Sequence, residues 1–222
     1  MTQDTVDGTA KIEIDEDLLI PVHDPTLSKL NPIGIKEIRS SPYHEKSHWL
    51  DLTTIPQNYQ IVSLALQSFH PIIPNYAFET YYESFNIEQI VELSKQYSKD
   101  LDYTFPKTEI YVIAFRSILH EPVQTSIEKR QFLGKIDKES HLEATESGGL
   151  IKYWFGTPDD STGQNLATCW WVSKEHAKRG GGGKSHRQGM AAVKGWYKYW
   201  KVEEYQLVIE HNFDSFTFNR VV

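Results

Sequence analysis

The hydrophobic pattern of the chain is most regular in its second half, where two apolar runs flank a polar loop. Residues 148–155 read GGLIKYWF and residues 165–171 read NLATCWW, while the loop at 156–163 holds glycine, proline, aspartate and serine. Runs rich in aromatic and β-branched residues that are bounded by turn residues predict strands. We therefore expect a β-hairpin, around which the rest of the fold is arranged.

Symmetric pairing of the two runs about the loop divides their side chains between two faces of a sheet. Trp154 then lies opposite Leu166, and Lys152 lies opposite Thr168. The second face is apolar, with Ile151, Tyr153, Phe155, Ala167, Cys169 and Trp171. The first face, which Leu150 and Trp170 complete, carries a lysine among aromatic rings, so the hairpin is the first place to look for a ligand site.

The remaining periodicities give a β-α-β-β-α-β order. The run 109–119 is the strongest single strand, a helical region covers 126–146, and the hairpin is followed by a helix around 186–200 and a strand at 205–209. This is the order of the ferredoxin-like split unit, so we predict an α+β fold. Because 111–115 is apolar without alternation, both sheet faces must be covered. Two helices cover one face, and the other needs either the N-terminal hundred residues or a second copy of the chain in a homodimer.

The N-terminal half divides by composition. Residues 1–20 are acidic with almost no aromatic content, which predicts a disordered segment. Residues 21–105 begin with closely spaced prolines that prevent a long helix, so we expect an extended arm and then a helix at 87–101. The apolar run 59–69 favours a strand. This part is expected to pack on a ferredoxin-like domain at 106–222.

Composition limits the classes of partner and the compartment. The net charge of −7 argues against nucleic acid or an anionic membrane as the main partner. Cys169 is the single cysteine, so no internal disulfide can form, and its place on the apolar face favours a packing role. No apolar run approaches the ~20 residues of a membrane span, and no targeting signal is visible. We expect a cytoplasmic or nuclear protein.

The stretch 44–48 reads HEKSH, which matches the H-E-x-x-H zinc pattern. On a helix this spacing would present two imidazoles on one face. The stretch lies between Pro42 and Pro56 without helical periodicity, Lys46 adds a positive charge beside the would-be metal, and no third ligand is evident. We therefore predict that the protein binds no structural zinc.

Four consecutive glycines at 180–183 precede a lysine and a serine. The stretch lacks the earlier glycine and the preceding strand of a phosphate-binding P-loop. A softer prediction is an anion site at the start of the following helix, formed by Arg179, Lys184, Ser185 and Arg187. The alternative is a flexible glycine linker with solvated charges.

Titratable residues near the predicted hairpin and its two helices suggest a ligand cavity between sheet and helices. The ligand-binding set that we predict is Lys152, Tyr153, Trp154, Trp170 and His186. Catalytic candidates are His186, His141 and Lys152, since imidazoles and a buried amine can move protons near neutral pH. The ligand expected there is small and aromatic or acidic, and no cofactor is indicated.

The hairpin sequence GGLIKYWFG with NLATC resembles the signature of a fungal protein family without an assigned activity. Other pieces that carry the resemblance are Phe115-Arg116-Ser117, His141, Glu143-Ala144, His186 and Trp200, so that it spans residues 107–211. In element order the second half is similar to the dimeric α+β barrels, which include cofactor-independent monooxygenases and haem-degrading enzymes. This likeness implies a ferredoxin-like fold and suggests a cofactor-independent, oxygenase-like activity.

Two further classes remain open. The stretch 170–192 loosely resembles the pyrophosphate-binding turn of acetyl-CoA-dependent N-acyltransferases, although Lys184 stands where a glycine is required. A splayed parallel pair of strands near 171–173 would favour that class, whereas the strand order 4-1-3-2 favours the split unit. The third class is a non-enzymatic interaction or scaffold protein, which has no sequence signature to test.

Overall fold

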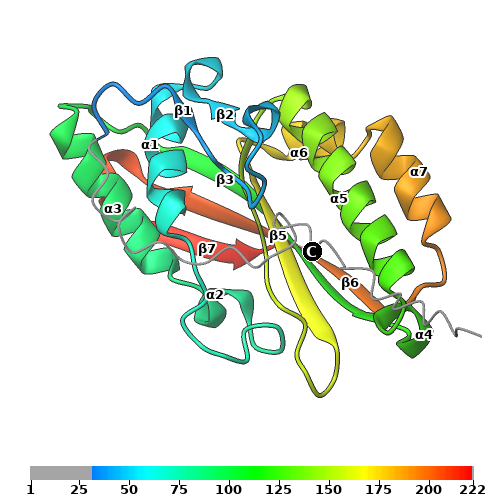
Figure 1. The fold of residues 1–222 in the computed structure, drawn as a ribbon. Coiled ribbons are helices and arrows are strands. Elements are labelled where there is room, and N and C mark those ends of the chain that lie inside the picture. The colour runs from blue at the N-terminus through cyan, green and yellow to red at the C-terminus, as the bar shows by residue number, and fades with distance from the viewer. Residues whose placement is uncertain (1–31, 222) are drawn as a thin grey trace, which may run out of the picture.

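The computed structural model describes residues 32–221, so the acidic segment 1–20 lies outside the described residues. The strands are β1 (Glu37–Ile38), β2 (Leu50–Asp51), β3 (Thr108–Leu119), β4 (Leu150–Phe155), β5 (Gln164–Trp171), β6 (Tyr197–Ile209) and β7 (Phe216–Arg220). The helices are α1 (Gln57–Ala65), α2 (Tyr81–Ser84), α3 (Ile87–Asp100), α4 (Glu121–Gln124), α5 (Ile127–Ser147), α6 (Lys174–Gly180) and α7 (Lys184–Ala192). Figure 1 shows these helices on both sides of a central sheet.

The main sheet confirms the α+β, ferredoxin-like fold. Its order is β4-β5-β3-β6-β7, and each neighbouring pair is antiparallel. Numbered along the chain from β3 to β6, the first four strands have the order 4-1-3-2 of the split unit, with α5 and then α6 and α7 as the crossovers. β5 is antiparallel to both of its neighbours, so the described sheet lacks the splayed parallel pair that would favour an acyltransferase.

The β4–β5 hairpin forms, but its register is shifted by two residues from the symmetric pairing. Trp154 lies opposite Thr168, and Lys152 lies opposite Trp170. A shift of two keeps each of these side chains on its expected face. A bulge between Leu150 and Lys152 then exchanges the faces of the sheet to which the side chains of Leu150 and Ile151 point. Leu150 therefore packs with Trp171 in one core cluster, and Ile151 packs in the other.

The face of the sheet that includes Trp154 and Trp170 is covered by α1, α3 and the segments around them. We call it the N-terminal face. The larger core cluster lies here and joins these tryptophans to Phe69, Phe85 and many aliphatic residues. The N-terminal part of the same chain thus covers this face. A second copy of the chain is not needed to cover it, so the open face no longer argues for a homodimer.

The strand expected at 59–69 is wrong, because α1 occupies Gln57–Ala65. Ile61, Val62 and Ala65 are fully buried in the larger cluster. A short apolar run that is buried on all sides has the same composition in a strand and in a core helix, so its periodicity does not distinguish them.

The opposite face, which we call the helix face, is covered by α5 and α6. A second cluster joins Tyr43, Tyr111, Leu150, Tyr153, Trp171 and Ala177. The glycine run ends α6 at Gly180 and forms the turn to α7, which begins at Lys184. Gly180 packs so closely on Trp171 that an added Cβ would lie 2.2 Å from the ring atom Cη2. Gly189 likewise brings α7 against Ile136 of α5, so α7 lies beside α5, as Figure 1 shows.

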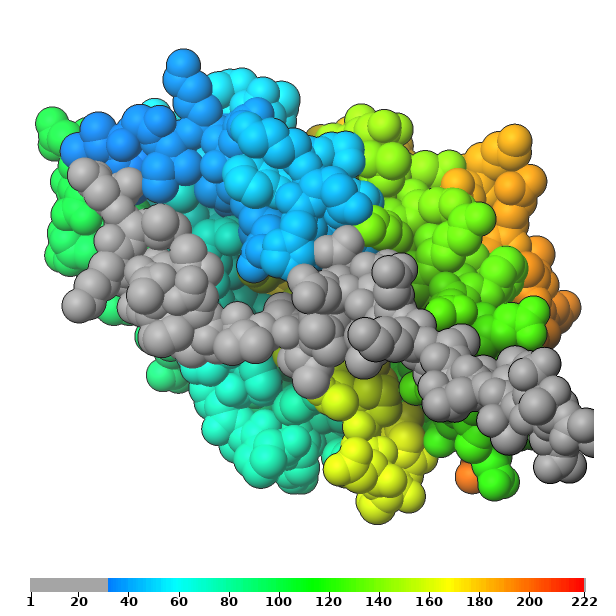
Figure 2. Space-filling model, viewed as in Figure 1, coloured from blue at the N-terminus to red at the C-terminus, as the bar shows by residue number. Residues whose placement is uncertain are grey.

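Residues 39–49, which connect β1 to β2, wrap around the open edge of β4, and we call them the hook. The hook starts after Ile38, which lies in the N-terminal-face cluster, and places Tyr43 in the helix-face cluster. It then returns to Leu50, which lies in the N-terminal-face cluster again. The backbone N–H of Tyr153 donates to the carbonyl of Ser40 at 2.8 Å, so the hook also covers the edge strand. In Figure 2 the blue surface of this segment meets the green surface of α5.

Candidate functional site

The carboxylate of Asp137 is held by two tyrosines between α5 and the sheet. Tyr153 donates its hydroxyl to Oδ1 at 2.6 Å, and Tyr43 of the hook donates its hydroxyl to Oδ2. Burial raises the pKa of Asp137, while the two hydrogen bonds oppose that rise. Burial and the nearby carboxylate raise the pKa of Tyr153 well above its usual value, so this tyrosine stays a neutral donor. The arrangement is a weakly acidic carboxyl with a fixed orientation.

Two buried imidazoles lie next to this carboxyl. Nδ1 of His48 is 2.8 Å from Nδ1 of His141, and each side chain is 4 % exposed. Burial, and secondly the neighbouring His48, lower the pKa of His141 to about 3, so that its ring is neutral. Its Nε2 is buried without a hydrogen-bond partner in the described part of the chain. An unsatisfied buried ring nitrogen is unusual and points to a functional or conformational role.

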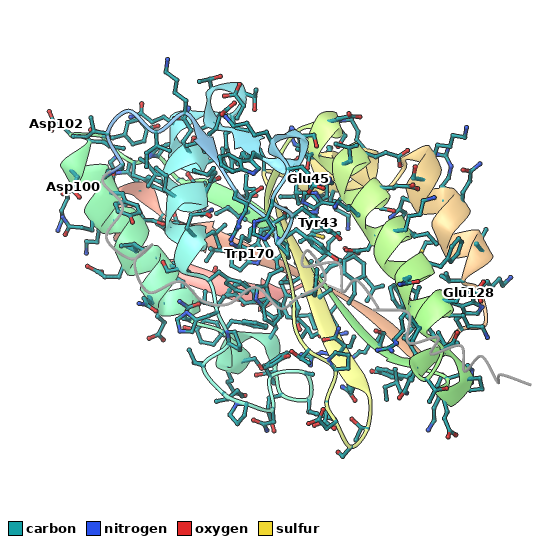
Figure 3. All side chains as sticks on the ribbon, in the orientation of Figure 1. Tyr43, Glu45, Asp100, Asp102, Glu128 and Trp170 are labelled. Carbon is teal, nitrogen blue, oxygen red and sulfur yellow. The ribbon has the colours of Figure 1, made fainter. Side chains whose placement is uncertain are left out.

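Tyr43 connects the histidine pair to the carboxyl. Its ring centroid lies 4.8 Å from that of His48 and 5.1 Å from that of His141. Lys138 of α5 lies over the same ring at 5.7 Å and forms a 2.5 Å ion pair with Glu45. Figure 3 shows Tyr43 and Glu45 beside α5. The hook therefore completes the site, and the side chains of α5 alone do not form it.

His186, a catalytic candidate from the sequence, lies at the start of α7 and is half-buried. Burial lowers its pKa, against the opposing charges of Glu143 and Asp137. Glu143 of α5 accepts from the backbone N–H groups of Ser185 at 2.8 Å and of His186 at 3.2 Å. The start of α7 thus already has an anion, and these bonds lower the pKa of Glu143.

The basic residues predicted around that helix start lie at the surface. Arg179, Lys184 and Arg187 are exposed, and Arg187 donates to the carbonyl of Gly182. Ser185 is engaged through its backbone N–H with Glu143. Gly180 and Gly183 pack closely against Trp171 and Glu143, and Glu143 stands where an external anion was expected.

Beyond Asp137, the helix face of the sheet is incompletely covered. Phe115 and Cys169 are half-buried, and Trp200 and Val202 of β6 are 40 % and 39 % exposed. The rings of Phe115 and Trp200 are 5.8 Å apart. Burial, and secondly Asp137, raise the pKa of Cys169, which keeps the thiol neutral and inert. A partly open apolar surface therefore borders the carboxyl group.

The ligand set expected from the sequence is divided by the sheet. Tyr153, His141 and His186 lie on the helix face, whereas Lys152, Trp154 and Trp170 lie on the N-terminal face. The two tryptophans are core residues, 5 % and 0 % exposed. Both pack edge-on against the ring of Phe69, and the indole N–H of Trp170 donates to the hydroxyl of Tyr81 at 3.0 Å. They are not available for stacking, and Lys152 cannot reach the same ligand as His186.

The amino-acid sequence alone did not point to three residues of the site, Asp137, His48 and Tyr43. Asp137 precedes His141 by one helical turn on α5, and this i, i+4 pair of polar residues was its only sequence signal. His48 appeared only inside the zinc-like pattern. Tyr43 had no signal, because it reaches Asp137 through the hook, from 94 positions away.

The two histidines of the HEKSH stretch have different surroundings. His44 is exposed and accepts from Nη1 of Arg39 at 2.8 Å, while His48 is buried against His141. Across residues 32–221, no group of three or more histidine, cysteine, aspartate or glutamate side chains is arranged to hold a metal ion. In the same residues, no helix has both the length and the apolar character to cross a membrane.

Comparisons with known proteins place the chain in a family. A family model described as PB2B2.08-like matches residues 39–220. The UPF0643 protein PB2B2.08 of Schizosaccharomyces pombe (strain 972 / ATCC 24843) is 51% identical over 212 residues, which are 95% of this chain and 96% of that protein. The two therefore correspond over nearly their whole lengths.

Solved structures show a more distant likeness. A putative antibiotic biosynthesis monooxygenase from Nitrosomonas europaea is 11% identical and matches with a TM-score of 0.36 over 43% of this chain and 88% of its own. SnoaB, a cofactor-independent oxygenase from Streptomyces nogalater, is 9% identical, with a TM-score of 0.32 over 44% of this chain and 89% of its own. Neither likeness bears on what this chain does. The family match and the yeast relative, in contrast, show that this chain belongs to the PB2B2.08-like family of fungal proteins.

Proposed function

We propose that this protein binds a small, flat aromatic molecule against the partly open helix face and that Asp137 takes an acidic proton from it. The observation that carries the proposal is the place of Asp137, a partly buried carboxyl fixed by two tyrosine hydroxyls beside exposed aromatic surface. Carboxyl groups with a raised pKa at the edge of an apolar surface are typical of general bases.

The geometry suits proton abstraction more than the binding of an anion. A ligand with a formal negative charge would be repelled by Asp137, whereas a phenol or an activated C–H group can donate to it. Tyr43 and Tyr153 keep the carboxyl in one orientation, which lowers the entropic cost of reaching the substrate proton. The rings of Phe115 and Trp200 would contact the flat face of the ligand.

The finer form of the proposal is a cofactor-independent oxygenase. Loss of the proton to Asp137 leaves an electron-rich carbanion, which supplies both electrons of a new C–O bond to O2. The resulting peroxide anion recovers the proton from Asp137 and leaves as a hydroperoxide, so that charge and electrons balance. In this chemistry the substrate itself is the reductant.

Proton exchange separates binding from base catalysis. A panel of phenols and activated aromatic ketones is screened by tryptophan fluorescence, and a bound compound is then followed by NMR for exchange of its acidic C–H with deuterated water. Wild-type protein should accelerate the exchange. Asp137→Asn keeps an acceptor for one tyrosine and should bind with similar affinity but exchange about 100-fold or more slowly.

Asp214→Asn is the matched control, since Asp214 is exposed. It should exchange at the wild-type rate. Full exchange by Asp137→Asn would contradict the assignment of the base, and failure of every panel compound to bind would contradict the ligand class. Oxygen consumption with a bound compound then tests the oxygenase step separately from proton abstraction.

A protein-binding role is the second candidate, because large apolar side chains are exposed at the α4 end of the sheet and helices. They are Ile127, Phe132, Met190, Tyr199 and Trp200, each between 38% and 45% exposed. Clusters of exposed aromatic residues favour contacts with other proteins. A stable dimer in solution that Trp200→Arg dissociates, without any bound aromatic compound, would favour this role.

A further inference from the structure

Among residues 32–221, Lys152 is a half-buried cation without a counter-charge on the N-terminal face. Its side chain leaves β4 opposite Trp170, which is fully buried. Within residues 32–221 its ammonium group has neither a hydrogen-bond partner nor an ion pair. A cation that loses part of its hydration without a partner is destabilised, so proteins usually place a carboxylate beside one. At Lys152 that carboxylate is missing from the described residues.

The charged neighbour of Lys152 is a second cation. The hydrogen bond from the N–H of Tyr153 to the carbonyl of Ser40 aligns the start of the hook with β4 and brings Arg39 beside Lys152. Burial and, secondly, the charge of Arg39 lower the pKa of Lys152 to about 8. Arg39 donates one guanidinium N–H to His44, and among the described residues it has no carboxylate partner either. Within residues 32–221, neither of these two neighbouring cations has a carboxylate partner.

We propose that Lys152 and Arg39 form a binding site for a phosphate group. Two positive charges match the charge of phosphate near neutral pH, which is about −1.5 to −2 on a monoester. The free N–H groups of arginine contact two oxygens of such an anion at once, and the lysine adds a point charge. The bound anion would supply the counter-charge that the described residues lack. The proposal stands apart from the proposed function, because the sheet separates Lys152 from Asp137.

Titration with inorganic phosphate tests the site directly. Wild-type protein at about pH 7 and constant ionic strength is titrated by calorimetry, with chloride as the reference anion. Saturable binding of one phosphate is expected, and Lys152→Met and Arg39→Gln should each weaken it about tenfold or more. Lys178→Met, which changes an exposed lysine of α6, should leave it unchanged.

The pH dependence distinguishes Lys152 from a surface cation. Affinity should fall as the pH rises through about 8, because the neutral amine no longer attracts the anion. Arg39 is exposed, so Arg39→Gln is expected to fold even where Lys152→Met does not, and it keeps the test decisive. Absence of saturable wild-type binding would overturn the proposal, as would an affinity that neither variant changes.

Discussion

His48 and His141 share a 2.8 Å hydrogen bond between their Nδ1 atoms, which joins the hook to α5 across the edge of the sheet. One ring must donate and the other accept, so the bond exists only while at least one of these nitrogens is unprotonated. Both rings are almost completely buried. The attachment of the hook, and with it the position of Tyr43 on Asp137, therefore depends on a neutral histidine.

Acid should weaken the folded state through His141. Its pKa in the folded protein is lowered to about 3 from an ordinary 6.5, so the unfolded chain binds more protons between these values. The contribution is fully present above about pH 6.5 and is lost as the pH falls toward about 3. At about pH 5 the loss amounts to roughly 2 kcal/mol.

Urea denaturation at a series of pH values measures this effect. His141→Gln should lower stability near neutral pH and should flatten the slope of unfolding free energy between about pH 6.5 and 5. His211→Gln changes an exposed histidine and should retain the wild-type slope. A wild-type slope in His141→Gln would mean that other groups carry the acid sensitivity.

Removal of one tyrosine hydroxyl should leave Asp137 with a single donor. Tyr43→Phe and Tyr153→Phe are each expected to cost about 1–3 kcal/mol, because a buried carboxyl loses a charge-assisted hydrogen bond. The double variant should show coupling, since both hydroxyls act on one carboxyl. Thermal and urea denaturation supply the values, with Tyr199→Phe as the exposed control. Full additivity would argue that the two hydroxyls do not share Asp137.

Arg116 should be irreplaceable by lysine. Its Nε donates to Glu203 at 2.9 Å in a buried ion pair, and its other nitrogens donate to the carbonyls of Ala77 and Glu79. Burial alone would raise the pKa of Glu203, but hydrogen bonds from Lys201 and Arg116 lower it to about 2. A lysine keeps the charge and cannot make all of these bonds.

The expected loss for Arg116→Lys is about 2–4 kcal/mol in urea denaturation, close to that of breaking a buried ion pair. Proteolysis should also cut sooner in the loop 75–80, which Arg116 holds on the sheet. Arg130→Lys on the exposed side of α5 serves as the control. Unchanged stability and unchanged cleavage would show that the hydrogen bonds of Arg116 are not needed to hold this loop on the sheet.

Glu143→Gln should destabilise the start of α7. The carboxylate accepts from the N–H groups of Ser185 and His186, and loss of its charge is expected to cost about 0.5–1 kcal/mol. Hydrogen exchange of the amides of α7 measures the local effect, and Glu146→Gln on the exposed part of α5 is the comparison. Equal protection of the α7 amides in both variants would argue that Glu143 does not stabilise the start of α7.

Most of the sheet was predictable because its signals are local. The hairpin, the strand at 109–119 and the helix at 126–146 are read from short runs, and the order of the strands fixes the split unit. The helix expected around 186–200 is wrong beyond Ala192, because α7 ends there and residues 197–200 already belong to β6. The two-residue shift and the bulge after Leu150 were not predictable, since a run of apolar residues does not specify which residues of the partner strand lie opposite it. The two-residue shift left the side chains on their predicted faces of the sheet, because side-chain direction in a strand repeats every two residues.

The candidate site was only partly visible in the sequence. His141, His186 and Tyr153 stood out by residue type, but the tryptophans that seemed suited to stacking fill the core instead. The decisive contacts of Tyr43 and Asp137 join segments far apart in the chain. No periodicity records such a tertiary contact. The sequence predicted an extended arm in this region, but it did not predict that the hook passes around the edge of β4.

The most direct test of the account is the titration of Asp137 by carbon NMR of the labelled carboxyl, assigned with Asp137→Asn. In the free protein the pKa of Asp137 should lie above the ordinary 3.8, because the carboxyl is buried. Addition of an aromatic compound that binds should move this resonance and its titration, while the exposed Asp214 stays unchanged. An ordinary pKa for Asp137, with no response to any bound aromatic compound, would contradict the assignment of the helix face as the functional site.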